Sequence, residues 1–392
     1  MTTDLVTQAQ ALFEYTQGLR RDFHRHPELG FQEFRTAGVI ARELGALGLP
    51  LRTGVAETGV VAALQGARPG PLVLLRFDID ALPVTEETGA EYASQNPGVM
   101  HACGHDGHTA IGLTVARLLH ARRDQIAGSV RLVFQPAEEG MGGAERMVAE
   151  GVLRQPVPDL ALALHLWNER PVGWIGAANG PCMAAAEVFH LRILGKGGHG
   201  ALPHLAVDPV LACAQVISAL QSIVARSVSP LDTAVVSVTL VRGGETFNVI
   251  PPEVELQGTI RTFDPATRQV VLQRFRELVT GVAAAHGCQA EIKLESLTPA
   301  VINDPRAAAR VRQAAGRLFP GIQVDSDFRT MGSEDMAFML QEVPGCFFFV
   351  GSADPARGLD ASHHHPRFDF DERALPLGAA LITAATLDFL NS

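Results

Sequence analysis

The sequence predicts an α/β protein in which helices flank a mostly parallel central sheet and a second, ferredoxin-like domain is inserted. Three observations support this fold class. Short apolar runs alternate with helical stretches along most of the chain. The middle of the chain instead has the order βαββαβ. The last of the short apolar runs that alternate with helical stretches comes after that middle segment. The 392 residues are enough for two or three domains.

The elements outside the middle segment are predicted from apolar periodicity and from stop signals. Helical spacing covers residues 5–19 and 31–47, and Gly48 and Pro50 end the second helix. Buried strands are expected where apolar runs are too short for helices, at residues 59–64, 72–77, 130–134, 160–164 and 346–350. Further helices are expected at residues 109–120 and 143–149, with an amphipathic helix over 371–390.

The middle segment predicts a separate domain. We expect strands at residues 187–194, 233–241, 253–263 and 288–294, with helices at 206–225 and 266–286. Alternation in the strands fits a sheet with one covered face. The expected domains are therefore residues 182–297 for the insertion and residues 1–181 with 298–392 for the discontinuous main domain.

Composition excludes several classes of protein. The formal net charge is −10, so no overall field favours nucleic acid or anionic membranes. No apolar run approaches the length of a membrane-spanning helix, and the N-terminal sequence lacks the pattern of a secretory signal. The five cysteines are scattered and form no CxxC pair, which argues against a disulfide framework. We expect a cytoplasmic protein.

The densest chemical signal is MHACGHDGH at residues 100–108, which holds three His, one Cys and one Asp. Cys103 and His105, two residues apart on a loop, could share a cation, since thiolate and imidazole are favoured ligands of zinc-like metals. A structural zinc site would usually have a second close pair, which is missing. The alternative is a buried or reactive cysteine among polar loop residues.

Acids and imidazoles also follow three of the predicted strands. They are Asp78 and Asp80, Glu138 and Glu139, and His165. The carboxyl ends of parallel strands share one edge, where α/β proteins place their ligand crevice. Any one of these residues could be a helix cap or turn former, but the coincidence of all of them predicts a site.

The pair Glu138–Glu139 indicates hydrolysis. Neighbours in an extended chain point to opposite sides, so one carboxylate can bind a metal while the other approaches the water that the metal activates. A carboxylate there can carry the proton to the leaving group. The alternative is a solvated acidic turn. Near the C-terminus, His363, His364 and His365 could supply one further ligand.

Other motifs are weaker. GKGGHG at residues 195–200 matches the dinucleotide pattern GxGxxG, but a loop with Pro203 follows it and the acidic partner is missing, so we regard it as accidental. His199 and Asn248 could stabilise an oxyanion, and Arg261 could clamp a carboxylate. From the residues alone, these three are more simply turn or strand-edge residues.

Six motifs in order resemble the M20 metallopeptidase family, specifically its amidohydrolase branch of hippurate hydrolases, indole-acetyl-amino-acid hydrolases and N-acyl-amino-acid deacetylases. They are HRHPE (24–28), RFDIDALP (76–83), MHACGHDGH, QPAEEG (135–140), HLWN (165–168) and HHHPRFDFDE (363–372). The similarity spans nearly the whole chain. It implies a zinc-exopeptidase-like main domain with an inserted lid and dimerisation domain.

The resemblance also implies roles for individual residues. Two divalent ions, of zinc, manganese, nickel or cobalt, would be held by Cys103, His105, Glu139, His165 and His364. His364 is chosen because the family places this ligand two residues before a proline, here Pro366. Glu138 would be the general base and later acid, and Asp80 would orient a ligand. Phe77 stands where a small residue is expected, and it could narrow the acyl pocket.

The implied reaction is hydrolysis of N-acyl-L-amino acids to a carboxylic acid and a free amino acid. Similar proteins are homodimers, in which His199 would reach the partner's site while Asn248 and Arg261 recognise the substrate carboxylate. Hinges near Cys182 and Leu297 would allow closure. Two alternatives stay open: a dipeptidase or carboxypeptidase on the same scaffold, and a non-catalytic two-domain protein that binds a metal or small ligand.

Overall fold

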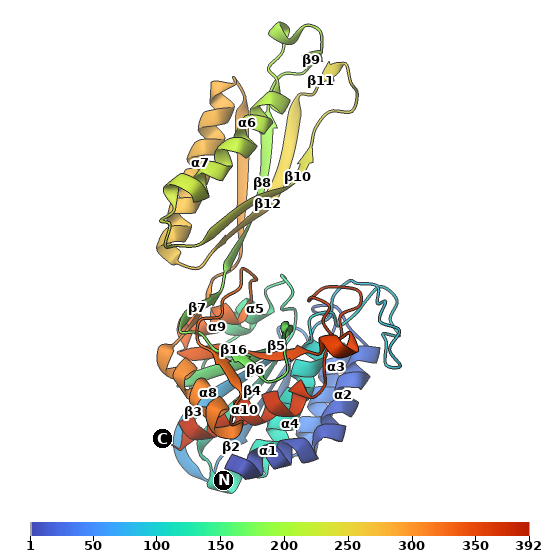
Figure 1. Ribbon diagram of the computed structural model, residues 1–392, viewed down its shortest axis with the longest axis vertical. Coiled ribbons are helices and arrows are strands. Elements are labelled where there is room, and N and C mark those ends of the chain that lie inside the picture. The colour runs from blue at the N-terminus through green and yellow to red at the C-terminus, as the bar shows by residue number, and fades with distance from the viewer. Residues whose placement is uncertain (1, 392) are drawn as a thin grey trace. The chain divides into compact units, whose positions relative to one another are not determined.

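The computed structural model describes residues 2–391, which form two compact units (Figure 1). Unit 1 comprises Met1–Cys182, Val301–Arg329 and Asp335–Ser392, and unit 2 comprises Met183–Ala300 with Thr330–Glu334. Unit 2 is therefore an insertion in the sequence of unit 1, to which the short segment Thr330–Glu334 is added. No sequence pattern predicted that segment.

Unit 1 contains an eight-stranded sheet in the order β1-β2-β4-β3-β5-β16-β6-β15. Its central strands β4, β3, β5 and β16 are parallel to their neighbours within this group. The outer pairs β1–β2, β2–β4 and β16–β6 are antiparallel. The strands are β1 (Leu51–Val55), β2 (Gly59–Gln65), β3 (Arg68–Asp78), β4 (Ala127–Gln135), β5 (Leu160–Pro171), β6 (Trp174–Gly176), β15 (Gln323–Asp325) and β16 (Gly345–Ala353). The α/β fold class with a mostly parallel sheet is confirmed.

Helices cover both faces of this sheet. Figure 1 shows α4, α8 and α10 on one face and α5 and α9 on the other. The helices of unit 1 are α1 (Thr2–Ala11), α2 (Phe13–Arg25), α3 (Phe34–Ala46), α4 (His105–His120), α5 (Gly143–Ala149), α8 (Pro305–Leu318), α9 (Met336–Glu342) and α10 (Ala374–Leu390). The short strands β7 (Gly180–Met183) and β14 (Val301–Asn303) pair with each other.

Three local expectations differ from the structure. The first helix is interrupted at Leu12, whose carbonyl accepts a hydrogen bond from the Thr16 hydroxyl at 2.9 Å. Helix α10 is buried along nearly its whole length rather than amphipathic, because it packs between the sheet and other helices. Phe77 does not narrow an acyl pocket: it lies in the core, where it contacts Phe134 with ring centroids 5.5 Å apart.

Unit 2 has its own core and a four-stranded antiparallel sheet, in the order β10-β12-β8-β13. Its elements follow one another as β8 (Ala185–Leu194), α6 (Pro209–Ser222), β10 (Ala234–Arg242), β12 (Glu253–Thr262), α7 (Pro265–Ala285) and β13 (Gln289–Thr298). In β12, buried and partly buried residues alternate strictly, since α6 and α7 cover one face of the sheet.

Unit 2 also contains a two-stranded ribbon and a long apolar helical stretch. Strands β9 (Gly198–His199) and β11 (Val249–Ile250) form an antiparallel ribbon. The helical stretch Pro209–Ser227 is long and apolar enough to cross a membrane by length and composition alone. Its buried residues, among them Val216 and Leu220, belong to the core of unit 2, so the stretch serves as a core-covering helix of that unit.

Candidate metal centre

The predicted ligands of unit 1 lie on or next to adjacent parallel strands. Glu138 and Glu139 follow β4, which pairs with β3. Rather than following a strand, as expected, His165 lies within β5, which continues to Pro171 on the other side of β3. His105 is the first residue of α4, and Cys103 precedes it on a loop. The sheet order therefore brings segments that are remote in sequence to one edge.

Three overlapping groups of side chains each offer ligand atoms within 4.8 Å of one another: Cys103 with His105 and His165, Cys103 with Glu139 and His364, and His105 with Glu138 and Glu139. The Cys103 Sγ lies 3.5 Å from the His165 Nε2. The His364 Nε2 lies 3.3 Å from the Glu139 Oε1. Atoms that share an ion through bonds of about 2.0–2.3 Å must lie within about 4.6 Å of one another, and both of these distances meet that limit, so the spacing of the two pairs suits metal binding.

Two atoms of this cluster are buried without a hydrogen-bond partner. They are the His105 Nε2 and the Glu139 Oε1, which lie 4.0 Å apart. A buried polar atom left unpaired costs free energy, so such atoms usually have a partner in water, protein or an ion. Both atom types are metal ligands, and we conclude that the residues fit a divalent cation between them.

The charges in the cluster also favour a cation. The nearby Cys103 and Glu139 side chains raise the pKa of His364 to about 10, so these neighbours attract positive charge. Burial, together with His108 and His363, lowers the pKa of His165 well below its usual range. His165 is therefore a neutral imidazole, which is the form that binds a metal. Burial raises the pKa of the Cys103 thiol, and a bound metal would offset this rise.

Asp80 holds two of the candidate ligands in place. Its Oδ1 lies 3.1 Å from the His105 Nδ1, and its Oδ2 accepts a hydrogen bond from the Glu139 backbone N–H at 3.0 Å. Because the Nδ1 of His105 faces Asp80, the Nε2 of the same ring faces the other candidate ligands. A carboxylate behind a metal-binding histidine commonly fixes the ring and its tautomer.

Glu138 and Glu139 lie in a turn rather than in extended chain. The Gly140 N–H donates to the Glu138 carbonyl at 2.6 Å, and Ala137 has a positive φ of 54°. The premise that the two side chains point to opposite sides is therefore wrong. Instead, the turn lets both carboxylates reach the neighbourhood of His105.

His364 adopts a conformation that is rare outside glycine. Its φ is 66°, and its backbone N–H donates to the Ala102 carbonyl at 2.7 Å. This hydrogen bond joins the C-terminal histidine loop to the residue before Cys103. Histidine is enriched in this left-handed region, and such strain is common at functional sites.

The other three predicted site residues lie in unit 2. His199 in β9 pairs with Val249 in β11, and the exposed Asn248 directly precedes that strand. The Gly200 N–H donates to the Asn248 carbonyl at 2.8 Å, so His199 and Asn248 share one ribbon. Arg261 lies on β12, where its Nη1 donates to the Ser333 Oγ at 3.2 Å.

A buried ionic network next to the cluster was not predicted from the sequence. The Arg20 guanidinium contacts Asp106 at 2.8 Å and Asp369 at 2.8 Å. Asp106 directly follows His105, and it also lies 2.8 Å from the His24 Nδ1. Only one signal could have indicated this network: on α2, Arg20 and His24 occur at helical spacing on the face that buries Phe23.

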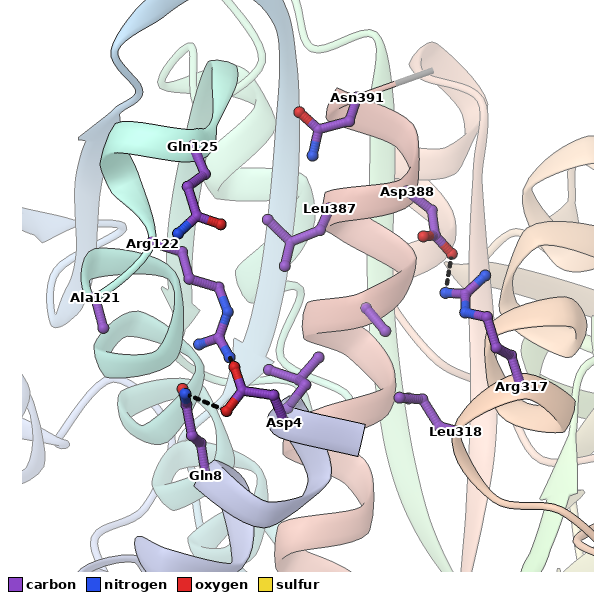
Figure 2. Close-up of a pocket in the computed structure, with 12 residues that line it drawn as sticks. Asp4, Gln8, Ala121, Arg122, Gln125, Arg317, Leu318, Leu387, Asp388 and Asn391 are labelled. Carbon is purple, nitrogen blue, oxygen red and sulfur yellow. Dashed lines mark hydrogen bonds and ion pairs between the residues drawn. The ribbon is translucent and has the colours of Figure 1, made fainter. Parts of the chain in front are cut away.

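A cavity of about 440 Å³ lies away from the cluster, at the far end of α4 (Figure 2). Its wall includes Asp4, Arg122, Arg317 and Asp388, and both arginines are already paired, with Asp4 and Asp388. A 16-residue helix is about 24 Å long, so this cavity is not part of the candidate metal centre.

The comparisons with known sequences all indicate the same protein family. Residues 74–388 match the profile of peptidase family M20/M25/M40. The chain is 42% identical over 366 residues to an N-acetylcysteine deacetylase of Bacillus subtilis, covering 92% of this chain and 93% of the relative. It is 40% identical to an N-acetyldiaminopimelate deacetylase of a Geobacillus strain, over 93% of this chain and 95% of the relative. It is 36% identical to thermostable carboxypeptidase 1 of Saccharolobus solfataricus, over 95% of each.

Solved structures agree with this result. A Staphylococcus aureus protein has a TM-score of 0.92 at 34% identity, and the match covers 100% of both chains. A Bacillus subtilis protein described as a dinuclear metal-binding peptidase of the M20 family has a TM-score of 0.85 at 37% identity, covering 97% of this chain and 99% of that protein. The similarity therefore includes both sequence and fold.

Proposed function

The chain belongs to peptidase family M20/M25/M40, and we propose that it is a metal-dependent amidohydrolase that cleaves the amide bond of N-acyl-L-amino acids. The products would be a carboxylic acid and a free amino acid. The observation that carries the proposal is the cluster in which Glu138 lies beside Cys103, His105, Glu139, His165 and His364. The names of two deacetylase relatives support the substrate class.

Two divalent ions would be held by the five candidate ligands. The donor set of one thiolate, three imidazoles and one carboxylate suits zinc, nickel, cobalt or manganese, and the dinuclear relative supports two ions. When bound, such ions polarise a carbonyl and make a water more acidic.

The remaining steps belong to residues of the chain. Glu138 accepts a proton from the attacking water and later donates it to the leaving amine nitrogen. Asp80 keeps the His105 ring oriented through the Nδ1 contact. In unit 2, His199 is suited to stabilise the oxyanion, and Asn248 and Arg261 are suited to bind the substrate carboxylate. Glu138 and the metal ligands lie in unit 1, whereas the residues that recognise substrate lie in unit 2.

Removal of the metals should abolish activity. We expect the purified chain to hydrolyse N-acetyl amino acids and hippurate, measured as amine release. Treatment with a chelator should stop turnover, and addition of zinc, manganese, nickel or cobalt should restore it. Unchanged turnover in metal-free protein would contradict the proposed function.

A carboxypeptidase or dipeptidase activity is the second candidate, because one relative is named a carboxypeptidase. The two activities differ in whether the acyl group carries a free amine. Parallel assays with a dipeptide and its N-acetyl analogue would separate them. Faster cleavage of the N-acetyl analogue supports the amidohydrolase, and faster cleavage of the dipeptide supports the peptidase.

We further propose a homodimer that forms through unit 2. Strand β10 is at the edge of the sheet of unit 2 and so offers unpaired backbone groups. Large apolar side chains are also exposed on unit 2, among them Leu231 at 94%, Val241 at 52% and Phe247 at 100%. A second copy of the chain could cover this surface and bring His199 to the partner's site.

Mixing two inactive variants tests whether His199 acts on the partner's site. A dimer of one Glu138→Ala chain and one His199→Ala chain would contain one intact site only if His199 acts in the partner. Random exchange of chains should then restore about a quarter of the wild-type activity. No restoration, under conditions where sedimentation shows mixed dimers, would place the function of His199 within its own chain.

We propose a cytoplasmic location. All five cysteines are free in the structure, which fits a reducing compartment. Reporter fusion and fractionation of the native host would test this location directly.

A further inference from the structure

The segment of residues 28–33, which lies between α2 and α3, contacts both chain segments that carry the proposed acid–base chemistry. The Ala81 N–H donates to the Glu28 carbonyl at 2.8 Å, and Leu29 forms a parallel bridge with Ala81. Ala81 directly follows Asp80. At its other end, the segment reaches the Glu138 loop, by which we mean residues 136–140.

The contact with the Glu138 loop is made by the carboxylate of Glu33. The side chain of Glu33 is fully buried, at 0% exposure. Its Oε1 accepts a hydrogen bond from the Ala137 backbone N–H at 2.9 Å, and its Oε2 accepts one from the Thr58 hydroxyl at 2.5 Å. Glu33 is 104 residues from Ala137 in sequence, so no local pattern indicates this contact.

The bond to Glu33 holds Ala137 in an unfavourable conformation. Ala137 has a φ of 54°, in the left-handed region that side chains other than glycine rarely adopt. Its carbonyl accepts from the Gly143 N–H at 3.0 Å, so both of its backbone polar groups are used. Without Glu33, a buried N–H would lose its partner, and the loop would relax toward ordinary backbone angles.

Close packing reinforces this contact. A Cβ added at Gly30 would lie 2.8 Å from the Met141 Sδ and 3.1 Å from the Ala137 Cα. The backbone of the 28–33 segment therefore lies directly against the Glu138 loop, and a side chain at position 30 would separate them. The position of Glu138 and Glu139 thus depends on a remote N-terminal segment.

We propose that Glu33 is a positioning residue for the proposed hydrolysis. By accepting the Ala137 N–H, it sets the turn that directs Glu138 toward the attacking water and Glu139 toward the metals. This inference rests on the proposed function. It predicts that kcat and metal affinity depend more on an acceptor oxygen at residue 33 than on a negative charge there.

The protonation of Glu33 supports the same view of its role. Burial raises the pKa of Glu33 to about 7, although the hydrogen bond from Thr58 opposes the rise. Both the neutral and the ionised carboxyl keep an oxygen that can accept the Ala137 N–H. Glutamine keeps such an oxygen too, whereas alanine has none.

The test compares Glu33→Ala with Glu33→Gln. Loss of a residue that holds metal ligands in place through hydrogen bonds typically costs about 10–100-fold in metal affinity or activity. We expect Glu33→Ala to lose that much in kcat at saturating metal and to bind zinc more weakly in competition with a chelator. Its KM should change little, and Glu33→Gln should recover most of both losses. If the alanine variant does not fold, Glu33→Asp retains the charge but is too short to reach Ala137.

Glu28→Ala is the matched control. The Glu28 carboxylate also accepts two backbone N–H groups, from Arg35 at 3.0 Å and Thr36 at 2.8 Å, but both belong to α3. Its loss should lower thermal stability, and it should reduce kcat and zinc affinity much less than Glu33→Ala does. Wild-type kcat and zinc affinity in Glu33→Ala, or equal losses in the alanine and glutamine variants, would overturn the inference. Failure of the proposed function would instead appear in the wild-type chain, as a lack of amide hydrolysis, and zinc affinity would still test Glu33.

Discussion

Replacement of Glu138 by glutamine should lower kcat by about 10²–10⁴-fold, the usual contribution of a general base. The amide has nearly the same size as the carboxylate but cannot accept a proton from water. Glu138 and Glu139 both offer an oxygen within 4.8 Å of the His105 ligand atom, so the change removes the base beside the candidate metals. The measurement is amine release from an N-acetyl amino acid, with metal content determined on the same sample.

Variants of two other glutamates close in sequence serve as comparisons for Glu138→Gln. Glu139→Gln should lose metal, because its Oε1 is one of the two atoms of the candidate metal cluster that are buried without a hydrogen-bond partner. Glu145→Gln, on the exposed surface of α5, should keep both metal and activity. If Glu138→Gln retains the wild-type kcat, or if it loses metal as Glu139→Gln does, then Glu138 is not the general base.

The parts of the site that lie on or just after parallel strands could be predicted from sequence. Asp80, Glu139 and His165 could be placed at one sheet edge because parallel strands have a common direction, and buried strands are recognisable as short apolar runs. His364 could not be located in this way. It lies on a loop without secondary structure, and only the family pattern singled it out from its neighbours. The structure brings it to the cluster through a hydrogen bond to Ala102.

The long-range polar contacts could not be predicted at all. Arg20 is 86 residues from Asp106, and Glu33 is 104 residues from Ala137. Periodicity reports which face of an element is buried, but it does not report which remote residue will lie opposite. A charged residue on the buried face of a helix, such as Arg20 on α2, indicates only that some partner of opposite charge is present.

The Arg20 network connects three segments that surround the candidate site. Arg20 on α2 contacts Asp106 at the start of α4, and it also contacts Asp369 and Glu372 after the histidine loop. The side chains of Arg20 and Asp106 are both 0% exposed. Burial by itself would raise the pKa of Asp106, but Arg20 and His24 hold it below its usual range. The aspartate is therefore ionised in the folded protein and depends on its cationic neighbours.

Replacement of Arg20 by alanine should lower the free energy of unfolding by about 3–5 kcal/mol, because it leaves a buried charge without its partner. Denaturant titration of the metal-free chain would measure this loss. Arg21→Ala is the matched control: Arg21 is next on the same helix and also contacts Glu372, but its side chain is 33% exposed, so its loss should cost about 1 kcal/mol or less.

Acid titration distinguishes loss of the ion pair from loss of packing. Because the folded-state pKa of Asp106 is lowered, its ionisation stabilises the wild-type chain above the unfolded-state pKa of about 3.9, and this contribution is lost as the pH falls below that value. Without Arg20, the pKa of Asp106 should rise, so Arg20→Ala should lose less stability on acidification than the wild type. A variant whose stability runs parallel to the wild type at every pH would show that Arg20 stabilises the fold through packing rather than through charge.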